Sequence, residues 1–216
     1  MPSKNNMYQF EHKYENLAYI CGLDEVGRGC WAGPLVAAAC ILTKNYHNDN
    51  ILDSKKLSEN RRNILFNEIV KNALDYSIVF IDPKTVDEFN PKKSSIMAME
   101  QAVRNLKIKP DVLLIDAEKL NINIKQESII KGDDKSISIA AASILAKVAR
   151  DKYMIEQNSI YPNYKFDKNK GYGTADHIEA LNKYGIIERM HRKSYKPIKK
   201  ILNGEKIKSN TNLFTD

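Results

Sequence analysis

Two adjacent carboxylates, Asp24 and Glu25, stand at the end of an apolar run. The turn-like sequence Gly27-Arg28-Gly29 follows after a single valine. Two like charges at this separation raise each other's pKa unless a cation lies between them. Hard cations such as Mg²⁺ and Mn²⁺ accept carboxylate oxygens as ligands. The pattern therefore predicts a metal-binding strand end joined to a turn that receives a ligand.

Two more carboxylates end apolar runs later in the chain. Asp116 closes the run 111–116, and Asp133 closes the run 128–133 just before an expected helix. Because the active sites of open α/β sheets gather at strand ends, these carboxylates can converge on one point. Carboxylates placed there suit a pair of divalent cations that clamp the attacking and leaving oxygens of a phosphodiester displacement. The structural alternatives are a strand-end cap at Asp116 and a helix N-terminal charge at Asp133. Asp134 is a rival for the last position.

Several stretches resemble one known family. The residues 24–29 are similar to the D-E-x-G-R-G signature of type 2 ribonucleases H, the bacterial ribonuclease HII family. Further matches are D-S-K-x-L at 53–57, K-G-D at 131–133 and a variant of I-S-A-A-S at 139–143. Together the matches cover most of residues 17–195. The resemblance implies that the family's four catalytic and metal-binding acids are Asp24, Glu25, Asp116 and Asp133.

The same resemblance implies which residues read the substrate. Backbone groups of Gly27, Arg28 and Gly29 would contact the ribose 2′-OH, which is both a donor and an acceptor and distinguishes RNA from DNA. Tyr172 would pack on the sugar that follows the ribonucleotide. Family positions that hold backbone phosphates fall on Ser54, Lys55, Asn90 and Ser95. Without the resemblance, the turn reads as a plain tight turn, Tyr172 as an anchor of its loop, and the phosphate-binding set as solvated surface residues.

Three further family positions are expected to serve as scaffolding rather than chemistry. They are His177, the pair His191-Arg192, and Ser194-Tyr195, where a tyrosine replaces the family's phenylalanine.

Strands that alternate with helices must position these residues, which indicates an α/β or α+β class with helices packed on a mixed sheet. Strands are expected at 17–24, 35–42, 76–81, 111–116 and 128–133, although the alanines at 37–39 also suit a helix. Helices are expected at 58–70, 82–89, 92–106, 136–158, 175–184 and 194–202. The resemblance implies a ribonuclease H-like fold with a mixed central sheet flanked by helices. Its core would span about 17–185, with a C-terminal helical extension at 186–203. The two ends, a loose arm at 1–16 and a tail at 204–216, are expected to be flexible.

Length and composition are consistent with this organisation. A chain of 216 residues with 43% hydrophobic residues fits a single domain with a real core. The net charge of +7 suits a polyanion partner, although a Lys- and Asn-rich genome would also produce it. Three cysteines without C-x-x-C spacing argue against a disulfide framework or a zinc site. No run resembles a signal peptide or a membrane helix, so we expect a soluble, cytoplasmic protein. A monomer is also expected.

Three functions other than that of a type 2 ribonuclease H explain parts of the sequence. The glycines at 27, 29 and 33 faintly resemble a dinucleotide-binding loop, but Pro34 and a strand follow where that loop opens a helix. A non-catalytic RNA-binding protein would explain the basic charge but has no use for four strand-end carboxylates. A resolvase of the same superfold would share the acids but not the Gly-Arg-Gly turn with Tyr172.

The resemblance implies an endonuclease that uses two Mg²⁺ or Mn²⁺ ions. Its substrates would be the RNA strand of RNA–DNA hybrids and duplex DNA with an embedded ribonucleotide, cut 5′ of that ribonucleotide to give 3′-hydroxyl and 5′-phosphate ends. The residues 210–214, Asn-Thr-Asn-Leu-Phe, distantly resemble the Q-x-x-L-F peptides that dock on sliding clamps. A sliding clamp is therefore an expected partner.

Overall fold

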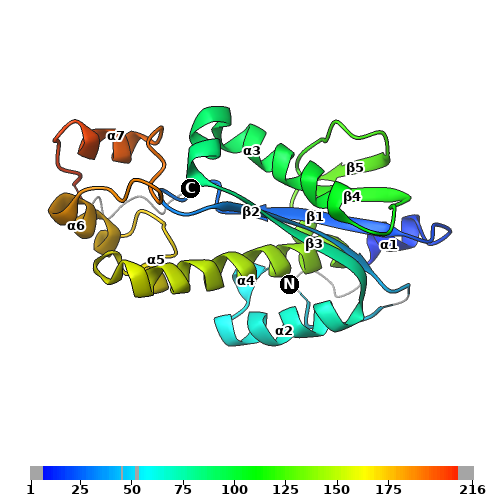
Figure 1. Cartoon of the computed structure of the whole chain (residues 1–216). Coiled ribbons are helices and arrows are strands. Elements are labelled where there is room, and N and C mark those ends of the chain that lie inside the picture. The colour runs from blue at the N-terminus through cyan, green and yellow to red at the C-terminus, as the bar shows by residue number, and fades with distance from the viewer. Residues whose placement is uncertain (1–6, 45, 52–53, 209–216) are drawn as a thin grey trace.

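A five-stranded mixed sheet forms the centre of the molecule (Figure 1). The computed structural model describes residues 7–44, 46–51 and 54–208. The spatial order is β3 (Ala73–Ile81), β2 (Leu35–Leu42), β1 (Ile20–Val26), β4 (Val112–Asp116) and β5 (Lys125–Ile129). The central strand β1 is antiparallel to β2 and parallel to β4, and β4 is parallel to β5. The near-continuous apolar runs in β1, β2 and β4 are buried, as expected for strands that are covered on both faces.

Helices cover both faces of this sheet, as the sequence predicts. In Figure 1, α3 (Pro83–Asn105) lies on one face, and α4 (Ile137–Ile160) with α2 (Glu59–Asn72) lies on the other. Odd-numbered residues of β1 such as Leu23 join the core under α3, whereas α4 packs on the opposite face. The contact between α4 and β1 is close, because a Cβ on Gly22 would lie 2.0 Å from the Ser138 carbonyl carbon. The helix can approach only because residue 22 has no side chain.

The helices begin at short polar residues whose side chains cap the first turn. Ser58 accepts a hydrogen bond from the Arg61 amide at the start of α2, and Ser136 accepts one from the Ile139 amide at the start of α4. Within α3, Asn90 has a φ of 67° and interrupts the helix before Pro91. The predicted break between two helices at Asn90-Pro91 is therefore confirmed, and the two helical segments of α3 meet at this kink.

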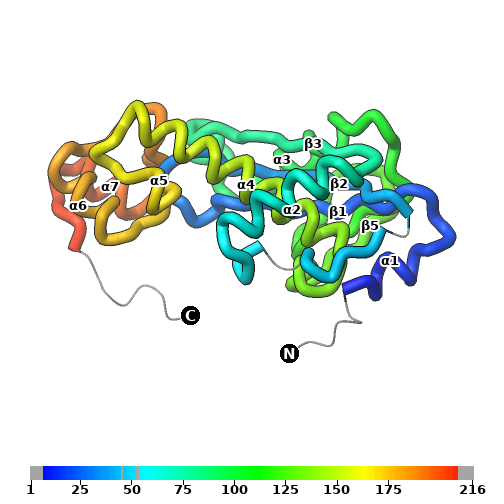
Figure 2. The backbone as a smooth tube through the Cα atoms, turned by 90° about the horizontal axis from the view of Figure 1, so that it is seen from below, coloured from blue at the N-terminus to red at the C-terminus, as the bar shows by residue number. Residues whose placement is uncertain are grey.

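The C-terminal helices form a separate group at one end of the sheet. α5 (Phe166–Asn169), α6 (Ala175–Tyr184) and α7 (Lys196–Leu202) surround a small apolar cluster that includes Phe166, Leu181 and Ile198. Figures 1 and 2 show this group beyond the end of the sheet opposite α1 (Gln9–Lys13). The long helix α4 connects the two regions.

Two elements differ from the sequence expectation. The predicted loose arm before residue 16 contains α1, and Tyr14 behind it is buried against the sheet. The fifth strand ends at Ile129, so Asp133 lies in the 3-10 helix Gly132–Asp134 rather than at a strand end. All three cysteines are free and buried, and no helix in the described parts of the chain is long and apolar enough to cross a membrane.

Candidate active site

Asp24 and Asp116 lie side by side at the edge where β4 ends. The parallel register pairs Leu23 with Ile115, so the next residues along the two strands are these two acids. β1 continues to Val26, whereas β4 stops at Asp116. Beyond this point β1 has lost its neighbour on that side, and the sheet opens next to Asp24 and Glu25. The sequence predicted this convergence from the position of each acid behind an apolar run.

Asp24 is buried on the face of β1 that α4 covers. Its carboxylate accepts hydrogen bonds from the Glu25 amide, at 2.7 Å, and from the Ser143 hydroxyl. Burial and then the negative charge of Glu25 raise the pKa of Asp24 well above its usual value, and the Ser143 hydrogen bond opposes this shift. The Ser143 hydroxyl also lies 3.0 Å from that of Ser54. Ser54 thus faces the acidic centre through Ser143, and its own side chain is buried.

Glu25 shares a cation with an acid that sequence reasoning missed. The Arg28 guanidinium donates to Glu25, at 3.3 Å, and to Glu118, at 3.0 Å. Burial raises the pKa of Glu25, and Arg28 opposes that rise. Glu118 is itself buried, and Lys92 on α3 lies 4.0 Å from it. No strand periodicity pointed to Glu118, because β4 ends at Asp116 and Ala117 has a φ of 53°.

Asp133 reaches the same region from the far side of β4. The amide of Gly132, its neighbour, donates to an Asp116 carboxylate oxygen at 2.7 Å. Lys55 lies 4.0 Å from the Asp133 carboxylate. Within the described residues, no group of three or more Asp, Glu, His or Cys side chains is already arranged as metal ligands. The four acids come from neighbouring positions, but their ligand roles stay predictions.

Two fully buried arginines hold the Gly27-Arg28-Gly29 turn. Arg192 donates to the carbonyls of Gly27, at 2.6 Å, and of Arg28, at 3.1 Å. Arg150 donates to the carbonyl of Pro34, at 2.9 Å. Gly27 itself has a φ of 93° and leaves no room for a side chain, since a Cβ there would lie 2.5 Å from Arg150 Nε. Arg192 therefore has the scaffolding position that the sequence predicted.

Arg150 was missed by sequence reasoning. It falls on the buried stripe of α4, four residues after Ala146 and four before Met154. That spacing was a usable signal, because a charged residue on an apolar helical stripe must have a specific partner.

Tyr172 lies in a loop that two histidines fix to the C-terminal segment. The Ile187 amide donates to Nδ1 of His191, at 2.8 Å, so the proton of this neutral ring is on Nε2. His191 Nε2 then donates to His177 Nε2, at 3.0 Å, and His177 Nδ1 donates to the Tyr172 carbonyl, at 2.9 Å. Both histidines are thus structural, as predicted. The Tyr172 side chain is 36% exposed and is available to a ligand.

The expected phosphate-binding residues occupy different environments. Lys55 is exposed next to Asp133. Asn90 lies at the kink of α3, where its side chain accepts a hydrogen bond from the Lys93 amide at 3.1 Å. Ser95 is fully buried and donates to the Pro91 carbonyl at 3.0 Å. Ser95 therefore stabilises the kink in this conformation, and a direct phosphate contact is not part of it.

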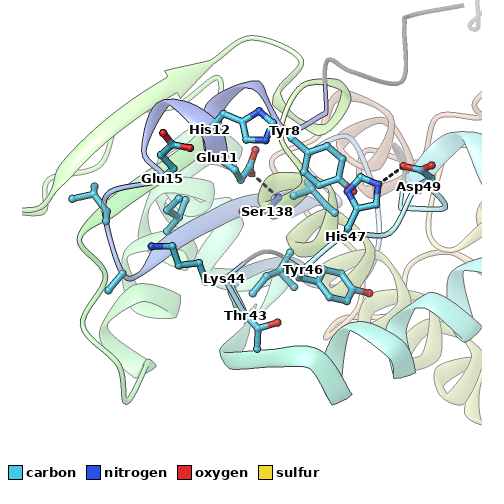
Figure 3. A pocket seen from close by; sticks show the side chains of 15 residues that line it. Tyr8, Glu11, His12, Glu15, Thr43, Lys44, Tyr46, His47, Asp49 and Ser138 are labelled. Atoms are coloured by element: carbon cyan, nitrogen blue, oxygen red, sulfur yellow. Dashed lines mark hydrogen bonds and ion pairs between the residues drawn. The ribbon is translucent and has the colours of Figure 1, made fainter.

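A hollow of about 740 Å³ lies at the end of β1 opposite the acids (Figure 3). Its walls come from the segment 8–18 and from the loop 42–49, and Ser138 lies at its base. Glu11 accepts hydrogen bonds there from the Ser138 amide, at 3.1 Å, and the Ser136 hydroxyl, at 2.6 Å. This carboxylate caps α4, and none of the predicted site residues lines the hollow. It is a structural junction between the N-terminal segment and α4.

Comparisons with known proteins identify the family of the chain. The family model described as Ribonuclease HII matches residues 21–198. Ribonuclease HII of Mycoplasma mycoides subsp. mycoides is 56% identical over 189 residues, which are 86% of this chain and 90% of that protein.

Two solved structures show the same fold. The crystal structure of ribonuclease H2 from Pyrococcus horikoshii OT3 has a TM-score of 0.73 at 24% identity, over 86% of this chain and 98% of that one. Bst-RNase HIII in complex with Mn²⁺ has a TM-score of 0.65 at 16% identity, over 87% of this chain and 70% of that one. The predicted ribonuclease H-like fold is confirmed. With the family match over most of the chain, the protein belongs to the ribonuclease HII family and is a ribonuclease H endonuclease.

Proposed function

We propose that this endonuclease hydrolyses the RNA strand of RNA–DNA hybrids and cuts duplex DNA 5′ of a single embedded ribonucleotide, with two divalent ions. The observation that carries the proposal is the meeting of Asp24, Glu25 and Asp116 at the open edge of β1, beside the Gly27-Arg28-Gly29 turn. An acidic centre serves hydrolysis, and the adjacent turn offers backbone groups to a ribose.

The donor set fits Mg²⁺ or Mn²⁺. Oxygen ligands only are available, and hard divalent cations prefer them over the softer metals that imidazole and thiolate select. Burial, and after it the charges of neighbouring carboxylates, raise the pKa values of Asp24 and Glu25, and a bound cation would offset both causes. The residues that would hold the ions are Asp24, Glu25, Asp116 and Asp133. When bound, the ions would lower the pKa of a water and neutralise charge on the leaving 3′ oxygen. The neighbouring Bst-RNase HIII structure contains Mn²⁺, which is consistent with this choice.

Side chains and backbone groups of the protein orient the carboxylates and are proposed to contact the substrate. Ser143 orients the Asp24 carboxylate, and Gly132 orients that of Asp116 through its amide. Arg28 holds Glu25 from the solvent side. The backbone of the turn is the group proposed to contact the 2′-OH, and the exposed Tyr172 ring supplies a flat apolar surface for the next sugar. Lys55 and Asn90 are the residues proposed to contact backbone phosphates, and Lys55 lies 4.0 Å from the Asp133 carboxylate.

The test is cleavage of two labelled substrates, a continuous RNA–DNA hybrid and a DNA duplex with one ribonucleotide. We expect both to be cut with Mg²⁺ or Mn²⁺, neither with EDTA, and the embedded ribonucleotide to be cut on its 5′ side, leaving a 3′-hydroxyl end. Asp116→Asn should lower kcat at least about 10²-fold, because it removes a charge that the ions require. Cleavage by this variant at the wild-type rate would refute the acidic centre.

The oligomeric state and a sliding-clamp contact stay predictions. Light scattering would check whether the protein is a monomer. The residues 210–214, which resemble a clamp-docking peptide, lie outside the described residues. Deletion of residues 208–216 should weaken binding to a sliding clamp without changing cleavage of a free duplex, and unchanged clamp binding would dismiss the peptide.

A further inference from the structure

Arg150 joins the two segments that the proposed function assigns to ribose recognition. Its guanidinium donates from Nε to Pro34 O, at 2.9 Å, and from Nη2 to Ala32 O, at 3.1 Å, in the segment that follows the Gly-Arg-Gly turn. Its Nη1 donates to Lys170 O, at 2.8 Å, two residues before Tyr172. The guanidinium carbon also lies 5.9 Å from the centre of the Tyr172 ring. One side chain therefore spans both segments.

The two segments touch each other directly at the same place. The amides of Trp31 and Ala32 both donate to Gly171 O, at 2.9 and 3.2 Å. A Cβ on Gly171 would lie 2.3 Å from Ala32 O, and one on Gly173 would lie 2.1 Å from the Trp31 ring. The contact has no spare room, so a change in the position of one segment must move the other.

Arg192 provides a natural comparison. It is as fully buried as Arg150 and also donates to backbone carbonyls, those of Gly27, Arg28 and Gly33. All of these belong to the turn and its flank, and none belongs to the Tyr172 loop. The two arginines thus have the same charge and burial, but only Arg150 connects the turn segment to the tyrosine loop.

We propose that Arg150 is a positioning residue that sets the spacing between the Gly27-Arg28-Gly29 turn and Tyr172. This inference rests on the proposed function, in which the turn contacts the ribonucleotide and Tyr172 packs on the next sugar. A planar guanidinium fork holds three carbonyls at fixed relative positions, whereas a lysine ammonium is a single point at the end of a flexible chain. The spacing matters most for a lone ribonucleotide, because only one step of the substrate then carries the correct sugar pair. On a continuous hybrid every register offers a ribose.

The kinetic test uses Arg150→Lys and Arg192→Lys, each alone and combined with Tyr172→Ala. We expect Arg150→Lys to lower kcat/KM for the single-ribonucleotide duplex about tenfold more than for the hybrid, since small misplacements of a substrate cost large factors. In the Tyr172→Ala background, Arg150→Lys should cause no further change in this ratio. Arg192→Lys should keep its full effect in that background. An undiminished effect of Arg150→Lys on the ratio without Tyr172 would overturn the proposal.

Amide hydrogen exchange tests the same role without activity. Arg150→Lys should speed exchange at the Trp31 and Ala32 amides, which donate to Gly171 O, at least about tenfold. The Gly33 amide donates to Met190 O instead and should be unaffected. Equal acceleration at all three amides, or at none, contradicts a positioning role for Arg150.

A fallback variant and a separate control complete the design. If Arg150→Lys does not fold, as judged by thermal unfolding, Arg150→Gln retains a planar donor and takes its place. If wild-type enzyme leaves the single-ribonucleotide duplex uncut, the proposed function fails, and the exchange result still decides whether Arg150 joins the two segments.

Discussion

At the scale of single residues, the site combines carboxylates whose negative charge is only partly compensated with neighbouring groups that are held by hydrogen bonds. Asp24 is buried and Glu25 half-buried, and both carboxylates have raised pKa values. The only cation that contacts either of them within the described residues, Arg28, is shared with Glu118. The binding of further cations would therefore stabilise such a centre. The residues around it are rigid by contrast: hydroxyls, amides and guanidinium groups have fixed partners. Local charge therefore favours ligand binding, while the surrounding hydrogen bonds preserve geometry.

The histidine pair behind Tyr172 should make the protein sensitive to mild acid. Burial lowers the pKa of His177 to about 4 and, with the charge of His177, that of His191 to about 3, against about 6.5 in the unfolded chain. Because both folded-state pKa values are depressed, the unfolded state binds more protons below pH 6.5. The stabilisation is complete above about pH 6.5 and is lost as the pH falls towards 4, by on the order of 3 kcal/mol for His177.

Urea unfolding between pH 7.5 and 4.5 measures this loss. His177→Asn should flatten the pH dependence in that range, although the variant is less stable at pH 7.5. The matched control is His47→Asn, because His47 is exposed, where it lies beside Asp49 and stacks on Tyr8. A wild-type profile that is flat from pH 6.5 to 4.5 would contradict the prediction.

Residue types alone located some of the site, and partner geometry was needed for the rest. Asp24, Glu25 and Asp116 could be predicted because strand packing does not require a carboxylate directly behind an apolar run, whereas a metal site does. Glu118 could not be separated from ordinary surface acids, since its burial depends on Arg28 and Lys92 from other elements. Ser95 matched a phosphate-binding position, but its burial follows from the kink at Asn90, which only the folded helix shows.

At the scale of elements, the closeness of α4 to β1 is the main requirement of the site. Gly22→Ala should destabilise the protein by about 2–3 kcal/mol, because the added Cβ would lie 2.0 Å from the Ser138 backbone and must separate strand and helix. Movement of α4 also shifts Ser143 away from Asp24, so activity should fall together with stability. Chemical denaturation and hybrid cleavage are the measurements.

Gly29→Ala is the matched stability control. A Cβ at this position would meet nothing within 4 Å, and the residue does not have a positive φ. Its unfolding free energy should stay within about 0.5 kcal/mol of the wild type. A similar loss of stability in both variants would show that the contact at Gly22 is not the cause.

The N-terminal segment should contribute measurably to α4. Glu11→Ala removes the acceptor of the Ser138 amide and the Ser136 hydroxyl and should cost about 1 kcal/mol, as for other helix caps. Glu15→Ala, an exposed acid in the same segment, should change stability by less than about 0.5 kcal/mol. Equal effects of the two substitutions in urea unfolding would argue for a general charge effect instead of a cap.

Elements with local signals were predictable, and elements held by distant contacts were not. Ser58 and the apolar spacing after it predicted α2, and the run Tyr76–Ile81 predicted most of β3. The helix α1 has five residues and is too short to be stable alone. It persists because Tyr14 is buried beside it and Glu11 binds α4, and neither contact is visible in local sequence.

At the scale of the whole molecule, the basic charge should govern substrate affinity. With a net charge of +7, binding to a duplex releases counterions, so affinity should fall at least about tenfold between 50 and 200 mM salt. Lys55→Gln should reduce the slope of log affinity against log salt by about one if Lys55 binds a phosphate. Fluorescence anisotropy in Ca²⁺ or EDTA measures binding without turnover. An unchanged slope would remove the phosphate role of Lys55.

Besides α4, the Gly27-Arg28-Gly29 turn and the residues that follow it join the C-terminal helices to the sheet. Ala32 forms an isolated β-bridge with His191, the Gly33 amide donates to Met190, and Arg192 fastens the turn's carbonyls. A chimaera that replaced the helical end alone would leave those carbonyls and amides without partners. Residues 27–34 and 190–192 should therefore be exchanged together in any chimaera, with the boundaries placed outside both segments.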